Sequence, residues 1–175
     1  LVLLARSDIS TIDPEFLKAG VDEKTIFNAL AAKMAGSKPL EIKKAAARVM
    51  NQKETHENLK TLEGFGVKVA YHAVDITDAK AVKEVLSKYE KIDGVIHAAG
   101  LEESQLMEKK DIKTFNTVFD TKINGALNLI EATEGKAYRY FLGFSSVAAR
   151  FGNEGQTDYS AANEMLTRLL QAQKR

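Results

Sequence analysis

The chain has 175 residues, of which 45% are hydrophobic and 28% charged, a composition that suits one globular domain with a substantial core. Its 25 basic and 24 acidic residues give a formal net charge of +1, so no strong field favours nucleic acid or a membrane surface as a partner. The sequence contains no cysteine, which excludes disulfides, thiolate metal sites and a cysteine nucleophile. We therefore expect no metal site, and the composition fits a reducing cytoplasm.

Short apolar runs alternate with longer amphipathic stretches, as in βαβ units built on a parallel sheet. The predicted strands are Leu1–Ala5, Val67–Val74, Gly94–Ala98 and Tyr138–Ser145. The predicted helices are Asp78–Tyr89, Leu106–Ala132 and Tyr159–Gln173, and Asp111–Lys113 is a candidate break within the second. The fold class we expect is α/β, with helices on both faces of a parallel sheet. The longest apolar runs have the length of strands, and we expect neither a signal peptide nor a membrane-spanning helix.

The stretch Asp8–Phe65 is long for a connection between two strands and is rich in Lys, Glu and Ala. It predicts two or three helices. Asp13-Pro14-Glu15 is a plausible helix start, Gly36–Pro39 a break, and Gly64–Gly66 the end of the last helix. A helical insertion of this kind, about residues 8–65, is more often a packing or docking element than a catalytic one.

Four polar residues form the candidate catalytic set: Lys122, Ser146, Tyr159 and Asn163. Reduction of a ketone by hydride needs a proton donor at the developing alkoxide, and a tyrosine phenol can serve. A nearby ammonium stabilises the phenolate that remains, and Lys122 is the candidate. Ser146 could hold the substrate carbonyl. Asn163, one helical turn after Tyr159, lies on the same face and can orient Lys122 or a relay water.

Each of these four residues also has an ordinary structural explanation. A serine can simply end a strand, a tyrosine and an asparagine can begin a helix, and a lysine can be solvated. The ordered set is much harder to explain by chance than any one member of it.

The stretches Phe144–Val147 and Arg150–Glu164 resemble the ketoreductase domains of modular and iterative polyketide synthases, which belong to the short-chain dehydrogenase/reductase superfamily. Asp93–Gly100 is similar to the motif that ends the family's fourth strand, and Lys122–Leu129 to its lysine-bearing helix. Ordinary short-chain dehydrogenases carry asparagine on that helix and lysine four residues after the tyrosine. Here the two are exchanged, as in the synthase ketoreductases. The Arg-Phe-Gly-Asn motif at 150–153 and the helical insert are also similar to those of ketoreductases in polyunsaturated fatty acid synthases.

The resemblance implies a Rossmann-like, doubly wound parallel sheet and NADPH-dependent reduction of a β-ketoacyl thioester to the β-hydroxyacyl thioester. It implies an acyl carrier protein bearing the β-ketoacyl chain and other synthase domains as partners, and neither nucleic acid nor a membrane. In these terms Tyr159 is the acid, Ser146 the carbonyl anchor, Lys122 the cation beside the phenol and Asn163 its support.

The expected cofactor contacts follow the strand ends. Arg6 and Ser7 come directly after the first strand, where a guanidinium can pair with a ribose 2′-phosphate. An acidic residue there favours NAD, and Asp8 is two positions along; the sequence favours NADPH. Asp75 and Ile76 resemble the family's adenine contact, although Thr77 or Asp78 could equally make this stretch only a helix N-cap. Ala98, Ala99 and Gly100 are small, as close passage of a cofactor requires. His97 is expected to pack.

The sequence departs from the family pattern in two places. The family's glycine-rich pyrophosphate loop has no counterpart, because Gly64–Gly66 precedes a strand instead of a helix. We therefore expect residues 1–175 to be a partial domain that lacks the first βα unit and the last strands, and to bind NADPH poorly alone. A noncatalytic, bracing Rossmann-like subdomain is the alternative. A sugar-modifying extended short-chain enzyme would need lysine in place of Asn163.

The stereochemistry of the product hydroxyl is not assigned by the sequence. Glu103 only partly matches the Leu-Asp-Asp motif that many ketoreductases carry in this loop, and Phe151 stands where the opposite class carries tryptophan. The loop from Gly100 to Ser104 is equally explained as a solvated acidic turn.

Overall fold

A computed structural model describes residues 1–173. The chain divides into two compact units, one formed by Leu1–Ala73 and the other beginning at Val74. The helices of the predicted insert belong to the first unit, together with its two strands. The predicted extent of the domain, residues 1–175, stays a prediction.

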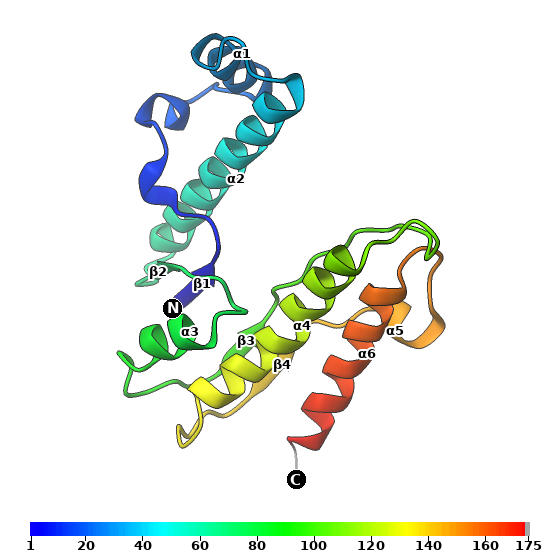
Figure 1. The fold of residues 1–175 in the computed structure, drawn as a ribbon. Coiled ribbons are helices and arrows are strands. Elements are labelled where there is room, and N and C mark those ends of the chain that lie inside the picture. The colour runs from blue at the N-terminus through cyan, green and yellow to red at the C-terminus, as the bar shows by residue number, and fades with distance from the viewer. Residues whose placement is uncertain (174–175) are drawn as a thin grey trace. The chain divides into compact units, whose positions relative to one another are not determined.

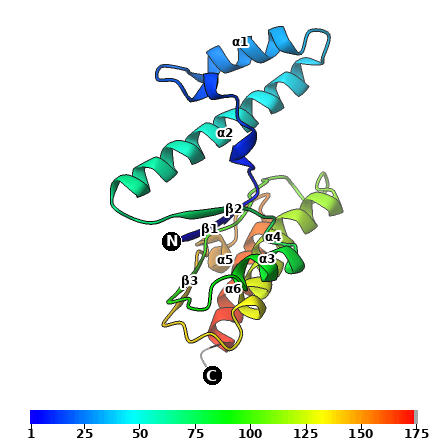
Figure 2. The same cartoon turned by 90° about the vertical axis from the view of Figure 1, so that its left-hand side faces the viewer.

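In the first unit two parallel strands pair with each other, and the segment that connects them in the sequence forms helices (Figure 1). Strand β1 (Val2–Ala5) pairs with β2 (Ala70–Ala73) in the register Val2↔Ala70 to Ala5↔Ala73. The connection contains η1 (Ile9–Thr11), η2 (Pro14–Leu17), α1 (Glu23–Lys33) and α2 (Pro39–Gly64). Helix α1 lies beside α2 in both views (Figures 1 and 2), and the two helices and the 3-10 turns share a core of Ile12, Phe16, Ile26 and Ala46.

The helix boundaries of this unit follow from capping residues. Asp13 caps η2, as predicted, by accepting a hydrogen bond from the Glu15 amide at 3.1 Å. The predicted break between helices is confirmed, because Gly36 adopts φ +92° and Pro39 begins α2. Gly66, at φ +77°, follows the end of α2.

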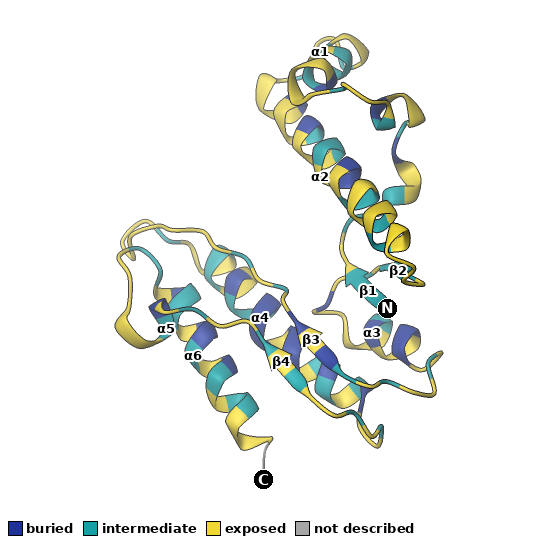
Figure 3. Ribbon diagram, turned by 180° about the vertical axis from the view of Figure 1, so that it is seen from behind, coloured by how far each residue is buried: buried dark blue, intermediate teal, exposed yellow. Residues whose placement is uncertain are grey.

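The second unit holds a parallel strand pair with helices packed against it. Its elements are α3 (Ala79–Leu86), β3 (Val95–His97), α4 (Ile112–Ala132), β4 (Phe141–Gly143), α5 (Ala148–Phe151) and α6 (Thr157–Ala172). Strands β3 and β4 are in register from Val95↔Phe141 to His97↔Gly143. Helices α4 and α6 pack through Ile123, Ala126, Ala162 and Leu166. Figure 3 shows buried positions alternating with exposed ones along both helices, as expected of helices that bury one face.

The α/β fold class with parallel strands and flanking helices is confirmed, and each predicted strand is present but shorter than predicted. The second predicted helix begins later than predicted, because Asp111 caps α4 and residues 106–110, predicted as helical, lie outside the helix. Helix α6 begins two residues earlier than predicted, and α5 was not predicted. None of the helices in residues 1–173 combines the length and apolar character needed to cross a membrane.

Candidate active site

Lys122 lies on α4 with only 5% of its surface exposed. Its Nζ donates a 3.0 Å hydrogen bond to the carbonyl of Phe144, the residue that follows β4. A Cβ atom added at Gly100, just beyond β3, would lie 2.8 Å from the same nitrogen. The ammonium therefore sits where β3 and β4 end, instead of pointing into solvent. Burial lowers the pKa of Lys122, because desolvation penalises its charged form.

The backbone of Lys122 is fixed by His97 on β3. The His97 Nε2 lies 2.8 Å from the Lys122 carbonyl, which can only accept, so Nε2 carries the proton. Burial is the main cause that lowers the pKa of His97. Gly125 allows this close approach of α4, since a Cβ there would meet His97 Cε1 at 3.1 Å and Ile76 Cγ2 at 3.0 Å. His97 therefore packs, as the sequence predicts.

Tyr159 and Asn163 occupy successive turns of α6. Asn163 is fully buried, and its Nδ2 donates a 2.8 Å hydrogen bond to the Tyr159 carbonyl. The Oδ1 atom of Asn163 is buried and has no hydrogen-bond partner. Tyr159 is half-buried. The amide of Asn163 thus holds the backbone of Tyr159 and leaves one acceptor available inside the unit, which is unusual for a buried oxygen.

The segment 144–146, directly after β4, is the point where these elements meet. The Phe144 carbonyl accepts from Lys122. The Ser145 hydroxyl donates to the Asn163 carbonyl at 3.0 Å. Ser146, half-buried, accepts a 3.2 Å hydrogen bond from the Ala148 amide at the start of α5. Three consecutive residues therefore contact α4, α6 and α5, and place Lys122 and the Asn163 backbone beside Ser146 at one end of the strand pair.

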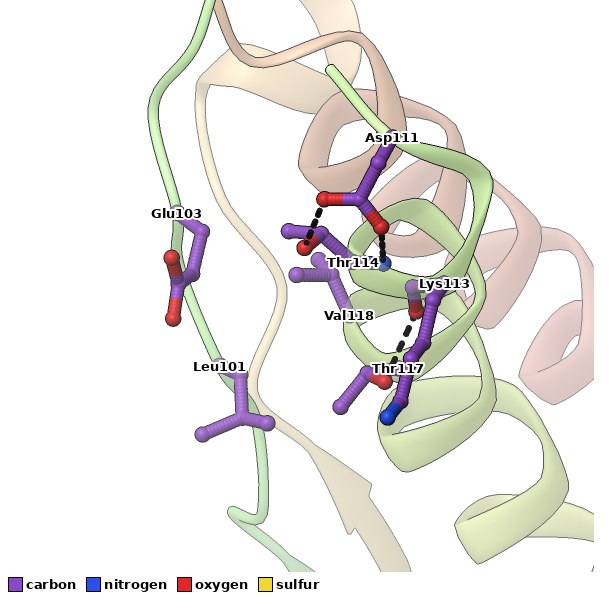
Figure 4. Close-up of a pocket in the computed structure, with 7 residues that line it drawn as sticks. All are labelled: Leu101, Glu103, Asp111, Lys113, Thr114, Thr117 and Val118. Carbon is purple, nitrogen blue, oxygen red and sulfur yellow. Dashed lines mark hydrogen bonds between the residues drawn. The ribbon is translucent and has the colours of Figure 1, made fainter.

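Two pockets lie near this end. The first, of about 370 Å³, lies between the loop after β3 and the start of α4 (Figure 4), and its lining is Leu101, Glu103, Asp111, Lys113, Thr114, Thr117 and Val118. The second, of about 420 Å³, is lined by Ser145, Ser146, Ala149, Arg150, Glu164, Thr167, Arg168 and Gln171. Neither is lined by Lys122 or Tyr159. Of the four predicted catalytic residues, Ser146 is the one that lines either of these two pockets.

The predicted cofactor contacts of the first unit are Arg6 and Ser7, which follow β1. Arg6 is exposed, and the Ser7 carbonyl accepts a 2.6 Å hydrogen bond from the Tyr71 hydroxyl. The neighbouring Asp8 carboxylate accepts from the Ser10 hydroxyl at 2.6 Å and the Ser10 amide at 2.9 Å. These bonds lower the pKa of Asp8, and through its Oδ1 the residue caps η1.

The remaining predicted cofactor contacts lie in the second unit. The Ile76 carbonyl accepts a 2.9 Å hydrogen bond from the Asn128 amide. The Asp75 carboxylate accepts from Thr77, whereas Asp78 is the residue that caps α3. The N-cap expected at Thr77 or Asp78 is therefore formed by Asp78. Asp75 and Ile76 take no part in this cap, and the adenine contact stays a prediction for them. Ala98, Ala99 and Gly100 follow β3, and Ala98 and Gly100 are exposed.

One buried pair was not predicted from the sequence. The Nζ of Lys110 lies 2.7 Å from the Asp158 carboxylate, and both side chains are almost fully buried, with 1% and 0% exposed. The two residues are 48 positions apart, and charged residues in a sequence are usually solvated, so no local pattern signals the pair. Among residues 1–173, no group of three His, Asp or Glu side chains is arranged to hold a metal ion.

Comparison with known proteins gives the chain a family. The KR-domain family model matches residues 28–175. A polyunsaturated fatty acid synthase polypeptide of Thraustochytrium sp. is 30% identical over 182 residues, which cover 96% of this chain and 6% of that protein. Polyketide synthase PksN of Bacillus subtilis is 36% identical over 112 residues, covering 62% of this chain and 2% of that protein. The chain thus spans a small part of these curated relatives.

Solved structures agree with this assignment. A ketoreductase domain from the bacillaene assembly line is 31% identical, with a TM-score of 0.63 over 70% of this chain and 32% of that one. An N-terminal ketoreductase from the macrolactin assembly line is 28% identical, with a TM-score of 0.62 over 69% of this chain and 27% of that one. The chain therefore belongs to the KR-domain family, the Rossmann-like ketoreductase domains of the short-chain dehydrogenase/reductase superfamily found in polyketide and polyunsaturated fatty acid synthases.

Proposed function

We propose that the chain contributes the catalytic part of an NADPH-dependent β-ketoacyl reductase in a cytoplasmic polyketide or polyunsaturated fatty acid synthase. Its substrate would be a β-ketoacyl thioester on an acyl carrier protein, and its product the β-hydroxyacyl thioester. Family membership supports this class of reaction. The observation that carries the proposal is the meeting of Lys122, Ser145 and Asn163 at the segment 144–146, beside Ser146.

The proton chemistry falls to the residues around that segment. Tyr159 donates its phenolic proton to the carbonyl oxygen as that oxygen becomes an alkoxide. The ammonium of Lys122 stabilises the negative charge left behind, and its partial desolvation strengthens that interaction. Ser146 hydrogen-bonds the substrate carbonyl, and Asn163 holds the Tyr159 backbone.

Small residues at the end of β3 support a dinucleotide site there. Ala98 and Gly100 are exposed directly beyond the strand, where a cofactor can pass close to the backbone. Arg6 would pair with the 2′-phosphate and Ser7, Asp75 and Ile76 would contact the adenosine part. The exposed Arg6 guanidinium directly after β1 supports NADPH over NADH, since it can pair with a ribose 2′-phosphate. When bound, NADPH supplies the hydride that the carbonyl carbon receives.

Substitution of Tyr159 by Phe tests this proposal. In the full-length protein, Tyr159→Phe should lower kcat for a β-ketoacyl thioester by about 10²–10⁴-fold, the usual contribution of a general acid. The Kd for NADPH, titrated by fluorescence, should stay within about twofold, because the phenol hydroxyl is the only group removed. A parallel titration with NADH measures the cofactor preference.

Tyr140→Phe is the matched control. Tyr140 directly precedes β4 and is 47% exposed. Within residues 1–173, no hydrogen bond joins its side chain to the site residues. It should leave both constants unchanged. Full activity in Tyr159→Phe would refute the proposed function.

A further inference from the structure

Two charges are buried together at the start of α6. Lys110 Nζ donates to both oxygens of the Asp158 carboxylate, at 2.8 and 2.7 Å, with 1% and 0% of the side chains exposed. Taking two charges out of water costs several kcal/mol per ion, and an apolar pair of similar volume is often as stable or more so. Stability alone therefore does not explain why this position holds charges.

Asp158 also contacts the residue beside it. Its Oδ1 accepts a 2.9 Å hydrogen bond from the backbone amide of Tyr159. Tyr159 is the third residue of α6, which begins at Thr157, and the first amides of a helix have no acceptor within the helix. The Asp158 carboxylate supplies that acceptor, and its charge suits the positive end of the helix. The same carboxylate thus holds Lys110 and the backbone of Tyr159.

Lys110 in turn holds the loop after β3. Its Nζ donates a 2.7 Å hydrogen bond to the carbonyl of Glu103, one of the residues that line the first pocket (Figure 4). Two further bonds join the same loop to the residues before α6: the Gln105 amide donates to the Gly155 carbonyl at 2.9 Å, and Gln156 Nε2 donates to Glu102 Oε1 at 3.0 Å. The loop wall of the pocket and the start of α6 are therefore bound together, in part through the buried pair.

We propose that Lys110 and Asp158 are positioning residues for the reduction: the buried pair fixes the backbone of Tyr159 relative to the pocket wall at residues 101–105. This inference rests on the proposed function, in which Tyr159 donates the proton. Reaction rates are sensitive to displacement of a catalytic group by as little as ~1 Å. A rigid, fully bonded carboxylate directly before the tyrosine meets that requirement.

Two double variants test the proposal in the full-length protein. Lys110→Met with Asp158→Asn removes both charges but keeps an amide oxygen that can accept from the Tyr159 amide. Lys110→Met with Asp158→Leu removes both charges and that acceptor, at similar volume. Neither variant leaves an unpaired buried charge, which single substitutions would do. Melting temperature, kcat, KM for the thioester and Kd for NADPH are measured for each.

The variant with Leu should have a kcat about tenfold lower than the parent protein and at least about threefold lower than the variant with Asn. KM and the Kd for NADPH should stay within about twofold in both, because binding groups are untouched. Equal kcat values in the two variants, or a kcat that simply follows the loss of melting temperature, would overturn the proposal.

If the variant with Leu does not fold, amide hydrogen exchange in the unsubstituted protein decides instead. The Tyr159 amide should exchange more slowly than that of Thr157, which begins the helix, and equal rates would overturn the proposal. The Tyr159→Phe measurement distinguishes a failure of the proposed function from a failure of this inference alone. Activity retained in Tyr159→Phe removes the proposed function itself, whereas activity lost there but equal in the two double variants removes only the role of the buried pair.

Discussion

Lys53 in the first unit and Lys122 in the second, both buried, show what separates a structural cation from a candidate catalytic one. Lys53 on α2 is 8% exposed and Lys122 on α4 is 5% exposed. Lys53 donates to the carbonyls of Val21 and Lys18, at 2.8 and 3.3 Å, and lies 3.8 Å from the Glu57 carboxylate. It ties the loop before α1 to α2.

Lys122 is held differently. Among residues 1–173 the structure records one hydrogen bond from its Nζ, to the Phe144 carbonyl, and no ion pair. An ammonium has three donors, so Lys53 is nearly satisfied by its own unit whereas Lys122 retains the capacity to bind another group. Burial with unused donors carries a cost in stability, which is typical of functional positions.

Substitution of Lys122 should give the largest effect among the tests of this comparison. Lys122→Met is expected to lower kcat by about 10²–10³-fold, because it removes charge stabilisation at the reacting oxygen. The free energy of unfolding should fall less than in Lys53→Met, since a desolvated charge is removed and only one carbonyl, that of Phe144, loses its donor. Steady-state kinetics and chemical denaturation measure the two quantities.

The matched variant in the first unit should behave in the opposite way. Lys53→Met leaves the carbonyls of Lys18 and Val21 without their donor, so we expect a loss of about 1–3 kcal/mol in the free energy of unfolding, with kcat unchanged. If Lys122→Met instead loses stability and keeps activity, the distinction between the two lysines is wrong.

A smaller effect is expected from Gly100→Ala. The added Cβ would lie 2.8 Å from Lys122 Nζ and 3.0 Å from its Cε, so the flexible end of that side chain must shift. We expect kcat to fall about tenfold, as for a modest displacement of a catalytic group, with little change in melting temperature. Gly64→Ala, where a Cβ meets nothing within 4 Å, is the control. An unchanged kcat in Gly100→Ala would indicate that the position of the ammonium is not critical.

The smallest effect concerns the pH dependence of stability. Burial lowers the pKa of His97 below its ordinary 6.5, so between the folded-state pKa and 6.5 the unfolded chain binds a proton that the folded chain does not. Stability should therefore fall as the pH is lowered below about 6.5 and level off below the folded-state pKa. The fall in melting temperature between about pH 7 and pH 5.5 should be smaller in His97→Gln than in the parent protein. A fall of the same size in both would show that His97 contributes nothing to it.

The order and type of most elements could be predicted from the sequence, because buried parallel strands are apolar runs and their connecting helices are amphipathic. The ends of the strands could not be predicted, because they depend on how far β3 and β4 stay in register. Helix α5 has only four residues, too few to show a helical period.

The identities of the candidate site residues were predicted, but not their environment. The sequence left open that Lys122 is merely solvated, and only the packing of α4 against β3 shows that it is buried. No pattern in the sequence indicates the Lys110–Asp158 pair, because the two residues do not lie at a regular spacing on one helix or strand. The loop after β3 brings them together. The burial of Lys122 and the pairing of Lys110 with Asp158 both depend on tertiary contacts, which no local sequence pattern indicates.

The central claim is that Lys122 acts through the phenolic oxygen of Tyr159, and a double-mutant cycle tests it most directly. The quantity measured is kcat at saturating NADPH for the parent protein, Lys122→Met, Tyr159→Phe and the double variant. If the ammonium acts through the phenol, the double variant should be no more than about threefold slower than Tyr159→Phe alone, since groups that act as a unit are strongly non-additive. Losses that multiply across the two substitutions would show that the two residues act independently and would contradict this account.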